Sequence, residues 1–163
     1  MTQVYNLAYW LHIISYLSWL IAFVGSLFYG VRIYFERAAT EKRNFMRLER
    51  LATSIGAHIG AIGILISGVV MSSFSGGPQW GWFHFQLYPW LALKQVLFIG
   101  ILLLVGFSIK RSLAFKKKVR QDQEKLSVEA ANLWASAYRT SIVVYILVTI
   151  NTILGLEKFN LAF

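Results

Sequence analysis

The chain has 163 residues, of which 57% are hydrophobic and 14% charged, and it carries a formal net charge of +9. An ordinary soluble domain is roughly 45–50% apolar and about 25% charged. The composition therefore excludes a disordered or fibrous chain and a soluble fold, and it predicts one membrane-embedded domain over residues 1–163. The sequence contains no cysteine, which excludes disulfides and thiolate metal sites.

Four apolar stretches are long enough to cross a bilayer, for which a helix needs roughly 20 apolar residues. The first stretch precedes Arg32, the first charged residue. It is longer than the apolar part of a signal peptide and has no basic start, so we expect a retained span. The sequence predicts an all-helical bundle with spans at about 7–31, 51–72, 90–109 and 139–156. The segment 72–90, which joins the second and third spans, contains glycine, proline and three of the six tryptophans, which is typical of a loop at a membrane interface.

The positive charge is distributed unevenly between the loops. Fourteen of the 16 lysines and arginines lie between the first and second spans or between the third and fourth. By the positive-inside rule both basic loops are cytoplasmic and both termini lie outside, as in a multi-pass protein of a bacterial cytoplasmic membrane. We expect the basic residues to orient the protein in the membrane and to contact anionic lipid, for instance at Lys116–Lys118. These two roles account for the positive net charge, so we expect no nucleic-acid partner. An amphipathic extension of the fourth helix is predicted by the helical spacing of Leu126, Ala130, Leu133 and Ala137.

Three ionisable side chains lie within the predicted spans, where such groups are costly and usually face the interior of the bundle. His12 and Lys94 each lie a short way from the outer end of their helices. Antiparallel packing therefore predicts that these two side chains reach the same depth near the outer leaflet. His58 lies in the other half of the membrane, which disfavours a single planar cofactor held between His12 and His58.

Aromatic residues accompany His12 and Lys94 along their helices. One face of the first helix is made of Tyr5, Tyr9, His12, Tyr16, Trp19 and Phe23, and one face of the third is made of Trp90, Lys94 and Phe98. A slot with a histidine on one side and an unprotonated lysine on the other suits a flat macrocycle, because haem iron takes histidine as an axial ligand. Alternatively, the aromatic faces are packing or interface anchors and Lys94 extends to the outer surface.

The second helix carries a stripe of small residues, Gly56, Gly60, Gly63 and Ser67, which predicts close packing against a neighbouring helix. His58 is offset from the stripe, and we expect it to hydrogen-bond across a helix interface; the alternative is a ligand to a second cofactor or a proton relay. A copper site formed by His12 and His84 is a further alternative, although its ligand set is thin. On the fourth helix, we expect interhelical hydrogen bonds from Ser141, Tyr145, Thr149 and Thr152.

Four stretches together carry a family resemblance. The segments LAYWLHIISYLSW, LFYGVRIYFERA, FMRLERL and WLALKQVLFIGILLL resemble the HemJ-type protoporphyrinogen oxidases, which belong to a wider group of small four-helix membrane proteins that includes CopD-like copper proteins. The resemblance covers roughly Leu7–Lys110. The family's helix-one histidine, downstream arginine and Trp-x-x-x-Lys correspond to His12, Arg32, Trp90 and Lys94.

The resemblance implies a bound haem b and oxidation of protoporphyrinogen IX to protoporphyrin IX. It implies that His12 and Lys94 hold the haem iron, that Trp90 lines the site, and that Arg32 is a candidate for binding a propionate. Two other hypotheses remain open from the sequence. The chain is either a non-enzymatic small subunit of a larger bioenergetic complex, ligating haem or a chlorophyll-type pigment, or a CopD-like copper protein. The expected partners are the lipid bilayer, a tetrapyrrole or haem, and other membrane subunits or a second copy of the chain.

Overall fold

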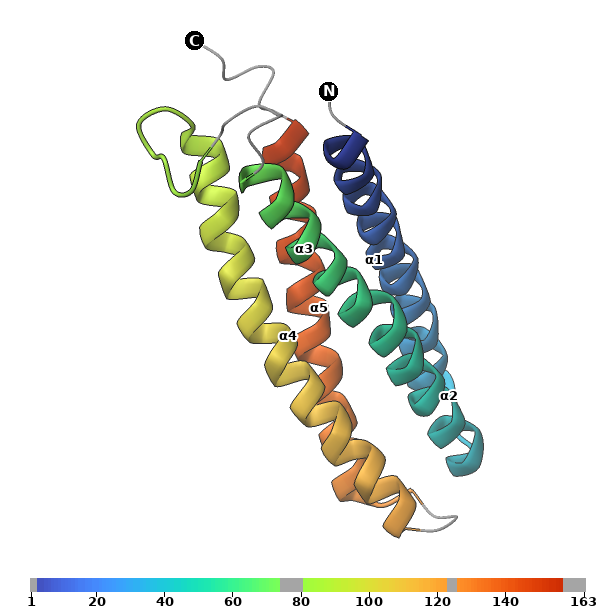
Figure 1. The fold of residues 1–163 in the computed structure, drawn as a ribbon. Coiled ribbons are helices and arrows are strands. Elements are labelled where there is room, and N and C mark those ends of the chain that lie inside the picture. Colours follow the sequence, from blue (N-terminus) through green and yellow to red (C-terminus); the bar gives the residue numbers. More distant parts are fainter. Residues whose placement is uncertain (1–2, 74–80, 123–125, 157–163) are drawn as a thin grey trace.

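The computed structural model describes residues 3–73, 81–122 and 126–156, and all regular structure in these ranges is helical. Four long rods pack into an antiparallel bundle (Figure 1). They are α1 (Gln3–Phe35), a continuous second rod of α2 (Ala39–Ala52), the π-helical segment η1 (Thr53–His58) and α3 (Ile59–Ser73), then α4 (Pro89–Gln121) and α5 (Val128–Leu156). Each rod is long and apolar enough to cross a membrane, which confirms the predicted all-helical bundle of four helices able to span one.

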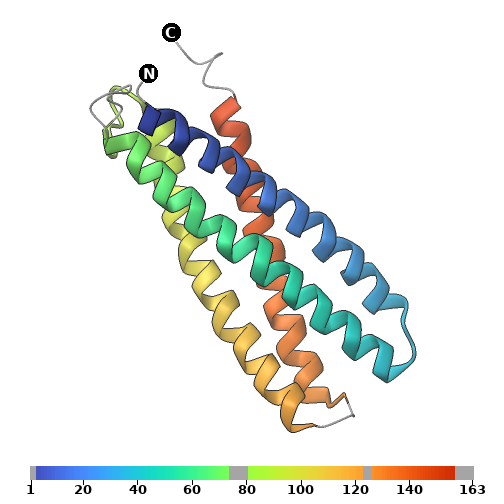
Figure 2. The ribbon, with the colours of Figure 1, turned by 45° about the vertical axis from the view of Figure 1, so that its right-hand side comes forward.

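The two ends of the bundle differ in charge. α1 begins and α5 ends at one end, whereas α1 ends, α2 begins, α4 ends and α5 begins at the other (Figures 1 and 2). The second of these ends carries most of the lysines and arginines and is called the basic end below. A helix of 33 residues such as α1 is about 50 Å long, which exceeds the roughly 30 Å of bilayer hydrocarbon.

The helices extend beyond the predicted spans at the basic end. α4 continues past residue 109 to Gln121, and α5 begins at Val128 rather than at 139. These extensions share an apolar core made of Ile33, Met46, Phe115, Val119, Ala130 and Trp134. The burial of Ala130 and Ala137 within α5 confirms the amphipathic extension, although Leu126 precedes the helix. A charged residue marks where a helix leaves the hydrocarbon but does not end the helix, because its backbone hydrogen bonds are internal.

Small residues set the spacing between α1 and the second rod. A Cβ atom added to Gly56 would lie 2.9 Å from the Ser18 carbonyl oxygen, and one added to Gly60 would lie 2.8 Å from the Ser15 carbonyl oxygen. Only glycine therefore allows the two backbones to approach this closely. The structure confirms the predicted small-residue stripe as a packing surface.

The bundle consists of two helix pairs, α1 with the second rod and α4 with α5, which are seen side by side in Figure 2. The pairs meet in a central apolar core whose buried members are Trp19, Ala22, Ala57, Ala61, Ile101, Val105, Val144, Tyr145 and Val148. Phe23 of α1 stacks on Tyr145 of α5, with their ring centroids 4.9 Å apart. Between this core and the one at the basic end lies a layer of buried polar side chains.

Candidate functional site

A hydrogen bond joins His12 of α1 to the small-residue stripe of the second rod. His12 Nδ1 lies 3.0 Å from the Ser67 hydroxyl oxygen. The Ser67 hydroxyl oxygen in turn lies 2.6 Å from the Gly63 carbonyl oxygen and 3.2 Å from the Ile64 carbonyl oxygen. A histidine that ligates a metal through one ring nitrogen commonly has its other ring nitrogen in a hydrogen bond of this kind, which orients the ring.

Lys94 lies on α4, one turn after Trp90, and all three of Trp90, Lys94 and Phe98 are partly buried. His12 and Lys94 both lie in the early turns of helices, α1 and α4, that begin at the end of the bundle opposite the basic end (Figure 1). The two residues come from different helix pairs. Within the described residues no group of three histidines, aspartates or glutamates is arranged to hold a metal ion.

Trp19 and Tyr16, two further residues predicted to contact the cofactor, pack against neighbouring helices. Trp19 is 1% exposed, and its indole N–H donates to the Ala57 carbonyl oxygen on the second rod. Tyr16 packs against the central core. Both rings therefore belong to the packing between helices on the side of α1 that carries His12.

Arg32 lies far from His12 along the same helix. α1 is unbroken between them, and 20 residues of α-helix separate the two Cα atoms by about 30 Å. Arg32 is exposed in the last turn, where its guanidinium lies 5.6 Å from the centre of the Phe28 ring. A single haem at His12 cannot reach Arg32, so the structure does not bring this pair together.

His58 lies in η1 and faces the second helix pair. Its Nε2 atom is buried and has no hydrogen-bond partner among the described residues, so the expected bond across the interface is not formed by this atom. A cavity of about 10 Å³ adjoins the ring, and Thr53, Ala57, Val105, Ser108, Ser141, Val144 and Tyr145 line it with mainly apolar surface. His84 is exposed in the loop before α4, where its ring lies against Gly81.

The most polar part of the interior is an ion pair that sequence reasoning missed. Glu49 and Arg50 of α2 are both 0% exposed. The Arg50 Nε and Nη2 atoms each donate to a Glu49 carboxylate oxygen at 2.5 Å. A charged pair held by two parallel hydrogen bonds is the strongest arrangement available to these side chains. Charge counting had assigned Arg50 to a loop, whereas the structure places it inside the bundle.

All four rods supply hydrogen bonds to this pair. The Glu49 carboxylate accepts from Ser26 of α1 at 2.7 Å, from Thr53 at 3.0 Å and from the Trp134 indole of α5 at 3.0 Å. Arg50 Nη1 donates to Ser141 of α5 at 3.2 Å and to Ser112 of α4 at 3.4 Å. We name these residues together the buried polar layer: Glu49, Arg50, Ser26, Thr53, Ser112, Trp134 and Ser141.

The buried polar layer continues toward His58. The hydroxyl groups of Ser108 and Ser141 are 3.0 Å apart, and the Tyr145 hydroxyl donates to Thr53 at 3.4 Å. These contacts confirm the predicted interhelical hydrogen bonds of Ser141 and Tyr145. Thr149 and Thr152 instead donate to carbonyl oxygens four residues earlier in α5, at 2.9 Å and 2.8 Å.

Comparison of the chain with protein-family models, with curated proteins and with solved structures gave no match. The class of protein is therefore defined by the fold and the sites alone. That class is an all-helical bundle with four rods able to span a membrane, a histidine hydrogen-bonded to Ser67 near one end and a buried ion pair toward the other.

Proposed function

We propose that the protein binds haem b within the membrane and that His12 and Lys94 would hold the iron. The observation that carries this proposal is the contact between His12 Nδ1 and the Ser67 hydroxyl at 3.0 Å. A second hydrogen bond of this kind orients a histidine that ligates a metal through its other ring nitrogen. Lys94 supports the proposal, because it lies in the early turns of a helix of the other pair that begins at the same end of the bundle as α1.

The surrounding residues suit a flat, apolar ligand. Trp90 and Phe98 lie one turn on either side of Lys94 along α4, and Tyr16 lies one turn beyond His12 on α1. When bound, haem b supplies one-electron redox chemistry. The chain itself would orient the imidazole through Ser67 and would supply the aromatic side chains of Trp90 and Phe98 beside Lys94 on α4.

We propose further that the reaction is oxidation of protoporphyrinogen IX to protoporphyrin IX, as the resemblance to HemJ-type oxidases implies, with the electrons passing to an external acceptor such as a quinone and the protons to solvent. Trp90 is then a residue that lines the substrate site. Because Arg32 lies about 30 Å along α1 from His12, a role for Arg32 toward a propionate would require a ligand at the basic end rather than the haem held by His12.

The absorbance spectrum of the purified protein tests the haem site. Wild-type protein from haem-replete cells should show a Soret band that is lost in His12→Ala and retained in His84→Ala, because His84 is exposed in a loop. Ser67→Ala should weaken haem binding by about 10- to 100-fold, the usual effect of removing a group that orients a metal ligand. Absence of a Soret band in the wild type, or an unchanged band in His12→Ala, would refute the proposal.

Complementation tests the reaction separately. The gene should restore growth to a bacterial strain that lacks its protoporphyrinogen oxidase, and His12→Ala should abolish this while His84→Ala does not. A Soret band without complementation would remove the oxidase activity but keep the haem. That outcome would favour the small haem-bearing subunit of a larger complex, which co-purification with other membrane subunits would then identify.

A further inference from the structure

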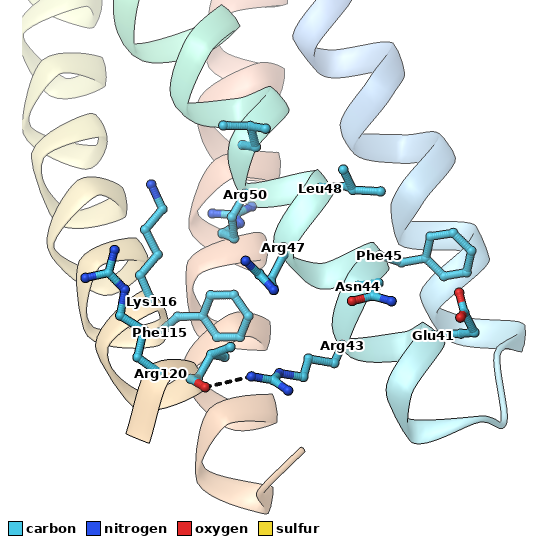
Figure 3. A pocket seen from close by; sticks show the side chains of 12 residues that line it. Glu41, Arg43, Asn44, Phe45, Arg47, Leu48, Arg50, Phe115, Lys116 and Arg120 are labelled. Carbon is cyan, nitrogen blue, oxygen red and sulfur yellow. Dashed lines mark hydrogen bonds between the residues drawn. The ribbon is translucent and has the colours of Figure 1, made fainter. Parts of the chain in front are cut away.

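A groove separates α2 from α4 at the basic end of the bundle (Figure 3). Its volume is about 730 Å³. We name it the basic groove, because five of the side chains that line it are cationic and only Glu41 is acidic. The cationic residues are Arg43, Arg47, Arg50, Lys116 and Arg120.

Two of the five cations are already engaged. Glu49 neutralises Arg50 through the buried ion pair. Arg43 donates from Nη2 to the Val119 carbonyl oxygen at 2.8 Å, one of the carbonyls in the last turn of α4 that lack a partner within the helix (Figure 3). The Arg43 Nε atom remains buried without a hydrogen-bond partner among the described residues.

The remaining three cations have no carboxylate of their own. The ion pairs within the described ranges join Arg50 to Glu49 and Lys118 to Asp122 and Glu129. They therefore leave Arg47, Lys116 and Arg120 without an acidic partner in that part of the chain. Figure 3 shows Arg47 extending from α2 toward Phe115 of α4, which lies between the two helices. An anion in this groove would meet several cationic groups from both helices.

The groove is also partly apolar, so an anion that fills it must also have an apolar part. Phe45, Leu48, Leu51 and Phe115 line it beside the cations. Leu51 opens the uncharged stretch that runs to Leu93, so the groove lies where the apolar part of the second rod meets its charged part. A lipid phosphate lies at this level of a bilayer, with acyl chains on the apolar side.

From the cationic and apolar lining together, we propose that the basic groove binds an anionic phospholipid, with the lipid phosphate held by Arg47 and Lys116 and the acyl chains against Leu48 and Leu51. This lipid bridges α2 and α4, which belong to different helix pairs and which the Arg43–Val119 hydrogen bond joins directly. The site is independent of the haem proposal, because the residues concerned are not those around His12.

Lipid binding is measured on the full chain in detergent with a fluorescent phosphatidylglycerol, and phosphatidylcholine serves as the zwitterionic reference. The double variant Arg47→Gln/Lys116→Gln should weaken phosphatidylglycerol binding by about 30-fold, the loss expected for two basic side chains at a lipid headgroup. The matched control Arg37→Gln/Lys117→Gln removes the same two residue types from exposed positions outside the groove, and its affinity should stay within about twofold of the wild type. Equal losses in both double variants would overturn the proposal, since they would show attraction by net charge alone.

Two further measurements keep the result interpretable. Lys116 is exposed on α4, so Lys116→Gln alone tests the site without endangering the fold and should weaken binding about fivefold. Inorganic phosphate at millimolar concentration should not displace the lipid. Full displacement by inorganic phosphate, or equal affinity for phosphatidylcholine and phosphatidylglycerol, would overturn the assignment of an anionic lipid.

Discussion

Replacing Glu49 by glutamine should destabilise the bundle more than most single substitutions in this chain. The carboxylate accepts five hydrogen bonds, two from Arg50 and one each from Ser26, Thr53 and Trp134. Glu49→Gln keeps the volume but leaves the Arg50 guanidinium buried with no opposite charge, and it points an amide donor at a cation. Breaking a buried pair by removing one partner costs about 3–5 kcal/mol.

Smaller and compensating changes provide the controls. Ser26→Ala removes one neutral donor to the same carboxylate and should cost about 1 kcal/mol. The double variant Glu49→Leu/Arg50→Leu removes both charges together and should be less destabilising than Glu49→Gln alone, because no unpaired charge remains. This ordering distinguishes a buried pair from two charges that face solvent.

Reversible unfolding in mixed detergent micelles measures these differences in the free energy of unfolding. Tryptophan fluorescence is a direct readout, because Trp134 donates to Glu49 and its environment changes when the pair is broken. The reasoning would be refuted if Glu49→Gln cost no more than Ser26→Ala, or if the double leucine variant were less stable than Glu49→Gln.

The remaining predictions concern a helix cap and helix packing. Ser127 donates to Asp122 and accepts from the Ala130 backbone N–H at 3.2 Å, and its hydrogen bond, with help from Lys118, holds the pKa of Asp122 below its ordinary value of 3.8. The lowered pKa of Asp122 stabilises the folded chain at pH values above 3.8, and this stabilisation is lost as the pH falls through the lowered pKa. Ser127→Ala should therefore move the Asp122 pKa back toward 3.8 in an NMR titration. The same substitution should also lower the free energy of unfolding by about 1 kcal/mol, because it removes the helix cap. Gly60→Ala should destabilise the bundle, since the new Cβ would lie 2.8 Å from the Ser15 carbonyl oxygen. Gly106→Ala, with nothing within 4 Å of its added Cβ, should be neutral or raise the free energy of unfolding by up to about 1 kcal/mol; an equal loss in both glycine variants would contradict the packing interpretation.

Hydropathy, charge placement and small-residue spacing were sufficient to predict the four rods and the close packing of the second rod against a neighbouring helix, although not that this neighbour is α1. These signals are local, since each depends on residues within one helix. The burial of Glu49 and Arg50 is not local. It depends on Ser26, Ser112 and Trp134, which come from three other rods and are separated from the pair by as many as 85 residues. Counting the lysines and arginines between predicted spans assumes that each of them is exposed to solvent. Only the positions of these distant partners show that Arg50 is buried.

The surroundings of His58 could not be read from helical spacing for a different reason. η1 interrupts the α-helical repeat between Thr53 and His58, and a π-helical segment rotates every later residue relative to a regular helix. The stripe at Gly56 and Gly60 still meets α1, but the direction of His58 relative to Arg50 changes with the extra residue in the turn. The serine and threonine positions within the apolar spans were the signal in the sequence that a polar layer existed.

The position of the ion pair along the chain has a consequence for the order of assembly. Ser26 and Thr53 are synthesised before or with the pair, whereas Ser112, Trp134 and Ser141 follow in the second half of the chain. Once the first helix pair has formed, it can therefore supply most of the hydrogen bonds that the Glu49 carboxylate accepts. The acceptors for Arg50 Nη1, however, lie only on α4 and α5. Until those helices dock, the early hairpin carries a polar surface that water or a membrane chaperone must cover. Docking of the second pair removes that surface, so the buried charges favour complete bundles over half-assembled ones.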